Sequence, residues 1–274
     1  MLGSVTALVT SDAAALEVHR LGGTACLTRL LRWLRQREQQ QRVDTQPLSL
    51  AAMAMLAALA TQPAAAGAIA QRRAFVEVLR ADAGLWEGCI CDAAGAMERY
   101  PRIGQVQGDA LSALTALLSP VPGFQSHHLN DYGIGLALDA LANHSGNGLV
   151  AEHALALLVT ALSTQDDAAR AGTAKRLYDA RRSKRGPSLD VFCEGFVSTL
   201  AKVIERLPPA EQWRQQDTLI LKNACQLMYW LCIARVQHPF LVPKEDVICM
   251  VRWSTAFVVT RALRALPLTT PRIC

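Results

Sequence analysis

Residues 126–145 read SHHLNDYGIGLALDALANHS, and this stretch decides the fold that we expect of the chain. Residues four apart lie on the same side of a helix, and four polar or small residues here form one such ridge: Asp131, Gly135, Asp139 and Asn143. Leucine, isoleucine and tyrosine fill most of the positions around the ridge, as in a helix packed between neighbouring helices. The stretch therefore predicts one helix of a larger helical array.

Looser copies of this pattern recur at intervals of roughly forty residues, the spacing of helical repeats. They predict four successive repeats, at 11–61, 62–100, 101–145 and 146–183. Each repeat is expected to contain a short first helix, a second helix and a third helix. Residues 110–120 are predicted as the second helix of the third repeat. The predicted third helices lie at 47–60, 85–100, 126–145 and 166–182.

Local signals indicate where several of these helices begin and end. Ser11 precedes the first apolar run, as an N-cap residue does. Gly22 and Gly23 end that run, because glycine readily adopts the left-handed conformation that terminates a helix. Pro47 is suited to the first turn of the alanine-rich helix that follows. Residues 62–73, QPAAAGAIAQRR, are predicted as a short helix that opens the second repeat.

Two motifs resemble the armadillo repeat family. Residues 137–144, ALDALANH, resemble the ALxALxNI signature of the third armadillo helix. Residues 23–31, GTACLTRLL, are similar to the second-helix motif of the family. The resemblance covers the four repeats more closely than the rest of the chain.

The resemblance implies an all-α fold, a right-handed α-solenoid of about four to five armadillo-like three-helix repeats. Four repeats would occupy residues 1–185, with a joint at residues 181–188 where charge, glycine and proline coincide. A degenerate fifth repeat and a closing helix would occupy 186–266. Residues 267–274 are expected to form a disordered tail.

In the armadillo family the third helices line a concave groove, where a tryptophan and an asparagine four residues apart hold an extended peptide. The tryptophan positions here are Ala54, Gly95, Asp139 and Lys175. The asparagine positions are Ala58, Arg99, Asn143 and Asp179. Only Asn143 matches, so an import-receptor-like peptide carrier is a less favoured alternative. The groove-binding residues that the resemblance implies are Arg99, Asp131, Asp139, Asn143, Lys175 and Asp179.

Composition agrees with a folded helical protein. Hydrophobic residues make up 51% of the chain and aromatic residues only 5%, and alanine and leucine dominate. The net charge of +5 permits an acidic partner without requiring nucleic acid. None of the eight cysteines forms a CxxC pair, and most lie in apolar patterns. We therefore expect buried, reduced thiols and a reducing compartment.

No catalytic, metal or cofactor motif is recognisable, and we expect neither an enzyme nor a cofactor. His127, His128 and Asp131 are the nearest approach to a metal site, with His144 or His153 as further ligands. We interpret the two neighbouring histidines as solvent-facing residues of a first helical turn.

Two segments are rich in basic residues. The first contains Arg29, Arg32, Arg35, Arg37 and Arg42. The second contains Arg170, Lys175, Arg176, Arg181, Arg182, Lys184 and Arg185. We interpret both as solvated helix faces, because stacking aromatic residues are not interleaved with them. A nucleic-acid-associated solenoid that uses these arginines remains the alternative function.

The expected function is a non-enzymatic protein-binding scaffold or adaptor within a larger assembly, with cytoskeletal assemblies as the class considered. The partners are then other proteins, and the location is the cytoplasm. The uncharged stretch 45–71 is alanine-rich and is bracketed by Pro47 and Pro63, so we do not expect it to span a membrane.

Overall fold

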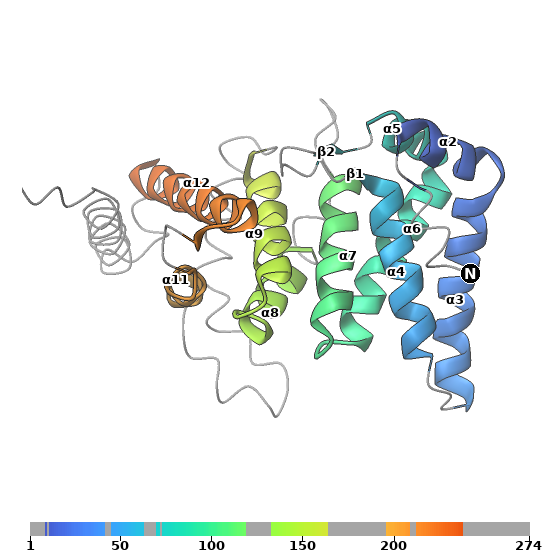
Figure 1. Cartoon of the computed structure of the whole chain (residues 1–274), viewed down its shortest axis with the longest axis horizontal. Helices are drawn as coiled ribbons and strands as arrows, with labels where there is room; N and C mark the ends of the chain where they lie inside the picture. Colours follow the sequence, from blue (N-terminus) through green and yellow to red (C-terminus); the bar gives the residue numbers. More distant parts are fainter. Residues whose placement is uncertain are drawn as a thin grey trace, which may run out of the picture. The chain divides into compact units, whose positions relative to one another are not determined.

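The computed structural model of the chain describes residue 9 and residues 11–41, 45–62, 70–71, 73–118, 133–163, 196–208 and 212–237 (Figure 1). These residues form helices, apart from one pair of two-residue strands, so the predicted all-α class is confirmed. Contacts divide the chain into two compact units, Met1–Gln165 and Asp166–Cys274. The division follows Gln165, earlier than the joint that the sequence predicts at residues 181–188.

The described helices of the first unit are α2 (Asp12–Arg20), α3 (Gly23–Gln41), α4 (Gln46–Ala60), α5 (Arg73–Ala81), α6 (Ala83–Arg99), α7 (Gly104–Leu117), α8 (Ile134–Asn143) and α9 (Gly148–Ser163). The predicted cap of α2 is confirmed, because Ser11 Oγ accepts a hydrogen bond from the Ala14 N–H at 3.2 Å. Gly22 has a φ of 77° between α2 and α3, a conformation that favours glycine. Pro47 lies in the first turn of α4, as expected.

The prediction of a short helix over residues 62–73 is wrong for Gln62, Ala70 and Gln71, which the structure describes as strand residues. Strand β1 (Thr61–Gln62) pairs antiparallel with strand β2 (Ala70–Gln71), with Thr61 opposite Gln71. The described residues of this segment are therefore extended and paired, with Gln62 opposite Ala70, rather than helical. Alanine content alone suggested a helix here, and strand pairing overrides that local preference.

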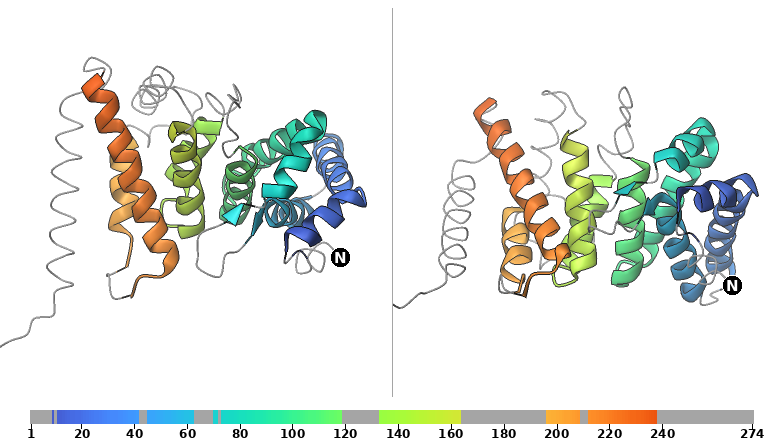
Figure 2. Two further views of the ribbon diagram at one scale, coloured as in Figure 1. Left: turned by 90° about the horizontal axis from the view of Figure 1, so that it is seen from above. Right: turned by 45° about the horizontal axis from the view of Figure 1, so that its top comes forward.

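The six longer helices of the first unit pack in two rows. One row contains α4, α7 and α9, and α7 contacts both of its neighbours extensively. The other row contains α3, α6 and α8, which contact one another less. Chain neighbours pack across the rows as the pairs α3/α4, α6/α7 and α8/α9. Figure 2 shows the first unit from two further sides.

These rows correct the predicted order of second and third helices. The described part of residues 126–145 is α8, which lies in the row of α3 and α6 rather than in the row of α4. Residues 110–117, predicted as part of a second helix, belong to α7, which packs against α4. An ALxAL spacing occurs on both α7 and α8, since any helix packed on two sides carries it. The spacing therefore does not indicate the row.

The short helices α2 and α5 pack against each other at one end of the rows (Figure 1). The rings of His19 and Phe75 meet edge to face across this contact, with centroids 5.9 Å apart. Phe75 is fully buried. The centre of the core is formed by leucines of α7, with Leu111, Leu114 and Leu117 all buried. Alanine and leucine thus form closely packed helix contacts, as the composition predicts.

The second unit contains two described helices, α11 (Phe196–Glu205) and α12 (Gln215–Gln237), which pack against each other. Buried apolar residues lie at helical spacing on both, including Leu200 and Ile204 on α11 and Ala224 on α12. The Trp213 indole N–H donates a hydrogen bond of 2.8 Å to the Pro208 carbonyl, which ties together the connection between the helices.

Candidate functional site

Helix α3 exposes a face rich in arginine. Leu27, Leu31 and Leu34 are buried against the neighbouring helices. The arginines Arg29, Arg32 and Arg35 fall on other sides of the same helix and are exposed. This amphipathic pattern explains why the helix forms here and why its cations remain accessible to a partner.

A buried carboxylate on α6 faces two of these arginines. The Asp92 side chain is only 5% exposed, and its Oδ2 lies 3.8 Å from Arg32 Nε. That separation exceeds a hydrogen bond, and Asp92 Oδ2 has no hydrogen-bond partner among the described residues. Burial raises the pKa of Asp92 to about 6, although the positive charges of Arg32, Arg35 and Arg99 oppose the rise. The carboxylate is therefore attracted by the arginines without being fully satisfied by them.

Two glycines on α6 make room for the guanidinium groups. Gly88 and Gly95 lie four residues before and three residues after Asp92, so all three share one side of the helix. A Cβ atom on Gly88 would collide with Arg32 Nη2. A Cβ atom on Gly95 would lie 3.7 Å from Arg35 Nη1. The sequence GCICDAAG thus encodes a small-residue surface on which arginines of α3 lie.

Arg99, a predicted groove residue, lies at the last turn of the same helix. Its Nε donates a hydrogen bond of 3.0 Å to the Gly95 carbonyl, and its guanidinium carbon lies 5.7 Å from the centroid of the Tyr100 ring. The Tyr100 hydroxyl is itself held by buried hydrogen bonds with Thr45 and Ser49 of 3.1 and 3.2 Å. The structure thus places Arg99 at the α3–α6 side of the unit.

Asp139 and Asn143, two further predicted groove residues, are exposed on α8 one helical turn apart. Their predicted common ridge is therefore confirmed, but α8 shares its row with α6, not with α4. The remaining predicted groove residues, Asp131, Lys175 and Asp179, lie outside the described residues.

The second basic segment also lies outside the described residues, including Arg170, Arg176, Arg181, Arg182, Lys184 and Arg185. So do His127 and His128 of the weighed metal cluster. His144 Nε2 forms a hydrogen bond of 2.8 Å with the Pro101 carbonyl. His153 is buried in α9, where burial lowers its pKa to about 4. Within the described ranges, no three metal-binding side chains lie close enough to hold an ion.

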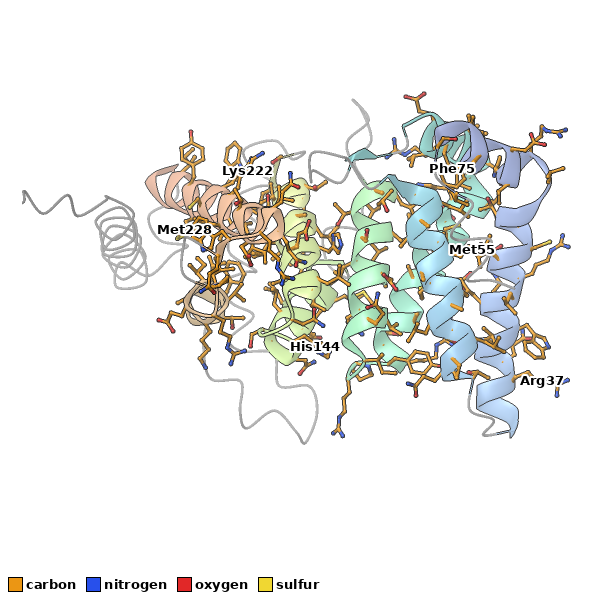
Figure 3. The ribbon with its side chains drawn as sticks, in the orientation of Figure 1. Arg37, Met55, Phe75, His144, Lys222 and Met228 are labelled. Atoms are coloured by element: carbon orange, nitrogen blue, oxygen red, sulfur yellow. The ribbon has the colours of Figure 1, made fainter. Side chains whose placement is uncertain are left out.

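The sequence interpretation missed Trp33. This residue lies between Arg32 and Arg35, so the first basic segment does contain an interleaved aromatic, and the contrary interpretation is wrong. Trp33 is 47% exposed. The guanidinium carbon of Arg37 lies 5.4 Å from the centroid of its ring, and Figure 3 shows Arg37 on the outer side of α3. The signal was the sequence RLLRWLRQR itself.

The expected burial of the cysteines is wrong for most of those that the structure describes. Cys26, Cys91 and Cys225 are exposed, and only Cys89 is buried. All four are free thiols. Burial, with a contribution from Asp92, raises the pKa of the Cys89 thiol to about 12, so that thiol stays neutral.

None of the helices in the described part of the chain is long and apolar enough to cross a bilayer. No known protein family, curated protein or solved structure matches the chain significantly. Function is therefore inferred from the geometry of the helices and from the exposed side chains.

Proposed function

We propose that the chain is a non-enzymatic protein-binding scaffold built from armadillo-like three-helix units and acting within a larger assembly. One observation carries the proposal: consecutive helix pairs lie side by side in two rows, so that each pair covers the next. This is how repeat proteins extend a surface while burying a continuous core. Such surfaces serve to bind other macromolecules along their length.

The packing supports a three-helix repeat in a register different from the one that the sequence suggested. The short helices α2 and α5 each precede a long pair and contact each other, as equivalent elements of adjacent repeats do. The first three-helix repeat is then α2–α3–α4 and the second repeat is α5–α6–α7. The pair α8/α9 forms the described part of a third repeat. In this register the third helices are α4, α7 and α9.

This register weakens the import-receptor alternative further. On α7 the family pattern falls on Ala110-Leu111-Ser112-Ala113-Leu114, so the tryptophan and asparagine positions are Ser112 and Ala116. On α4 they remain Ala54 and Ala58. Side chains this small have no amide to hold a peptide backbone and no ring to stack on it. A partner would then use other surfaces, of which the arginine face of α3 is the first choice.

Cross-linking mass spectrometry on native extract tests the scaffold proposal. We expect cross-links from exposed residues of the two rows to specific partner proteins, with cytoskeletal assemblies among the preparations to probe first. A chain denatured before cross-linking is the control for non-specific capture. Recovery of the native chain only as a lone monomer, under conditions that preserve known complexes, would reject the assembly role.

One observation favours a nucleic-acid-associated solenoid as a second candidate, namely the exposed ring of Trp33 beside Arg37. Binding of this kind loses affinity steeply as salt rises, because cations on the protein replace counterions on the phosphates. The test is binding of single-stranded RNA and DNA at low and high salt, with Trp33→Ala as the variant. Absence of binding at low salt rejects the candidate.

A further inference from the structure

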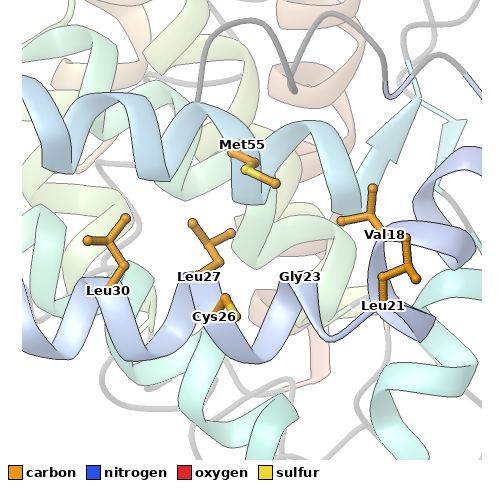
Figure 4. Close-up of a pocket in the computed structure, with 7 residues that line it drawn as sticks. All are labelled: Val18, Leu21, Gly23, Cys26, Leu27, Leu30 and Met55. Carbon is orange, nitrogen blue, oxygen red and sulfur yellow. The ribbon is translucent and has the colours of Figure 1, made fainter. Parts of the chain in front are cut away.

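An apolar hollow lies at the outer end of the first three-helix repeat, between α2, α3 and α4. Seven residues line it, on α2, α3, α4 and the turn between the first two (Figure 4): Val18, Leu21, Gly23, Cys26, Leu27, Leu30 and Met55. Its volume is about 320 Å³, and its lining is almost entirely apolar. A hollow of this size lies at the lower end of the range for ligand pockets and accommodates apolar side chains of a partner.

The hollow continues along α3 as a stripe of exposed and half-buried residues. Cys26, Leu30, Trp33 and Arg37 alternate at steps of four and three residues, so they lie along one edge of the helix. On α4, Leu48 lies seven residues before Met55 and therefore on the same side of that helix. Together these residues and the hollow form what we name the α3–α4 groove.

The α3–α4 groove faces away from the rest of the stack. Arg32 and Arg35 mark the side of α3 that approaches α6, through their positions over Gly88 and Gly95. The groove stripe lies on a different side of α3. Each unit of a helical stack covers the apolar face of its neighbour, and an end face needs a cap of its own.

Exposure of large apolar side chains shows that the described residues leave this face uncovered. Leu21 is 69% exposed, and Trp33 and Leu48 are each 47% exposed. These are three of the five large hydrophobic residues exposed in the described part of the chain. All three lie on α3, α4 or the turn before α3, the segments that border the hollow, and this clustering along the chain points to an interaction surface, since single exposed hydrophobic residues are common.

Charge at the groove indicates the chemistry of its occupant. Arg37 ends the stripe, and Arg29 lies beside it on the exposed side of α3. Neither forms an ion pair with a described residue. Tryptophan and arginine are also the residue types that most often dominate the energy of protein interfaces. A partner that buries Trp33 therefore brings acidic side chains to Arg29 and Arg37.

We propose that the α3–α4 groove docks the apolar face of an acidic amphipathic helix from a partner protein. The proposal rests on the scaffold function and names its partner class. Two packed helices leave a groove whose length follows their axes, and a third helix lies along it with residues at i, i+3 and i+7 as anchors. The hollow receives the apolar anchors, and glutamates or aspartates flanking them pair with the two arginines.

The test uses the full chain and a pair of helical peptides. Both carry leucines at i, i+3 and i+7 and are stapled to remain helical, and they differ only in flanking residues, glutamate in one and lysine in the other. Binding is measured by fluorescence anisotropy. We expect the glutamate peptide to bind at least about tenfold more tightly than the lysine peptide, since like charges oppose the latter.

Variants of exposed residues locate the binding without threatening the fold. Trp33→Ala and the double variant R29E/R37E should each lower the affinity for the glutamate peptide by about tenfold or more. Arg102→Glu, a single charge reversal at the exposed turn between α6 and α7, should leave the affinity for the glutamate peptide unchanged. Circular dichroism checks that every variant is folded.

Four results would overturn the docking proposal. These are equal binding of the two peptides, absence of binding by either, loss of binding in R102E to the same extent as in W33A, and unchanged binding in W33A and R29E/R37E. Two other results would assign the groove to a different occupant. Binding of a single-stranded oligonucleotide that W33A weakens would indicate a nucleic acid, and a dimer in sedimentation that W33A abolishes would indicate a second copy of this chain. Cross-links to partners on other surfaces would leave the scaffold function standing while this groove assignment fails.

Discussion

The α3–α6 contact and the α7–α9 contact join helices of the same unit by different means. The first has a buried carboxylate, two glycines and partly exposed arginines. The second is formed mainly by buried alanines and leucines, and the buried polar residues of these helices include Ser112, Glu152 and His153. Apolar packing stabilises the fold directly, whereas an incompletely satisfied buried charge reduces stability and keeps cations at the surface. The comparison teaches that α7 and α9 lie within the core, whereas α3 combines buried leucines with an exposed face that carries arginines.

Truncating a buried leucine of α7 should have the largest effect on stability. Leu111 is fully buried at the centre of α7. Leu111→Ala should lower the free energy of unfolding by about 2–5 kcal/mol, because it removes apolar contacts and leaves a cavity. Urea denaturation followed by circular dichroism measures the change. Leu48→Ala at a half-exposed position is the control, with an expected loss below about 1 kcal/mol. Equal losses would contradict the assignment of α7 to the core.

Neutralising the buried carboxylate should stabilise the protein. Asp92 has a pKa of about 6 in the fold against an ordinary value of 3.8, so the folded state favours its protonated form. Its contribution to stability therefore falls as the pH rises from about 4 to about 6 and stays low above that. Asp92→Asn should raise the free energy of unfolding at pH 7 by up to about 3 kcal/mol, since one pKa unit corresponds to 1.36 kcal/mol.

Urea denaturation between pH 4 and pH 7.5 measures this effect. The difference in the free energy of unfolding between Asp92→Asn and the original chain should grow from about pH 4 to about pH 6 and level off above that. Glu98→Gln, at an exposed carboxylate of α6, is the comparison for general charge effects. A difference for Asp92→Asn that does not depend on pH would show that Asp92 is ionised normally in the fold.

The contribution of His153 to stability should depend on pH in the direction opposite to that of Asp92. Burial lowers its pKa to about 4 from an ordinary value of 6.5, so the fold favours the neutral ring. The stabilisation is complete above pH 6.5 and is lost as the pH falls toward 4. At pH 5 the loss should amount to about 2 kcal/mol. His153→Leu should remove this slope, whatever its stability at pH 7, and a slope that persists in the variant would locate the titration elsewhere.

A pair of glycine substitutions gives the smallest effect and the closest comparison of the two contacts. A Cβ atom on Gly88 would meet the end of the flexible Arg32 side chain, which moves readily into solvent. A Cβ atom on Gly108 would lie 2.6 Å from Leu149 Cδ2, a branched side chain packed on α7. Alanine favours a helix over glycine by about 1 kcal/mol at both sites. Gly108→Ala should therefore be less stable than Gly88→Ala by about 1–3 kcal/mol.

Denaturation of the two glycine variants in parallel decides the comparison. Similar stability in both would mean that the α7–α9 contact tolerates added volume as well as the α3–α6 contact does. A marked loss in Gly88→Ala alone would instead show that Arg32 is fixed over α6 and contributes to the core.

Much of the fold was predictable from the sequence because its causes are local. Ser11, Gly22 and Pro47 act on the backbone next to them, so the boundaries of α2, α3 and α4 follow from the sequence. The strand pairing at the ends of residues 62–71 was not predictable, since the pairing of Thr61 with Gln71 depends on two chain segments meeting. The candidate site divides in the same way: the arginines of α3 were visible in sequence, but their relation to Asp92 and Gly88 was not.

The sequence by itself determined that this protein is helical, where several of its helices begin, and which helix presents arginines. The stretch at 126–145 predicted a packed helix with a polar ridge, and α8 is such a helix with Asp139 and Asn143 on one side. Only the tertiary structure decided that α8 stands beside α6 while α7 stands beside α4. The physical reason is that apolar spacing reports how much of a helix is buried, whereas the choice of neighbour depends on how all the buried faces fit together.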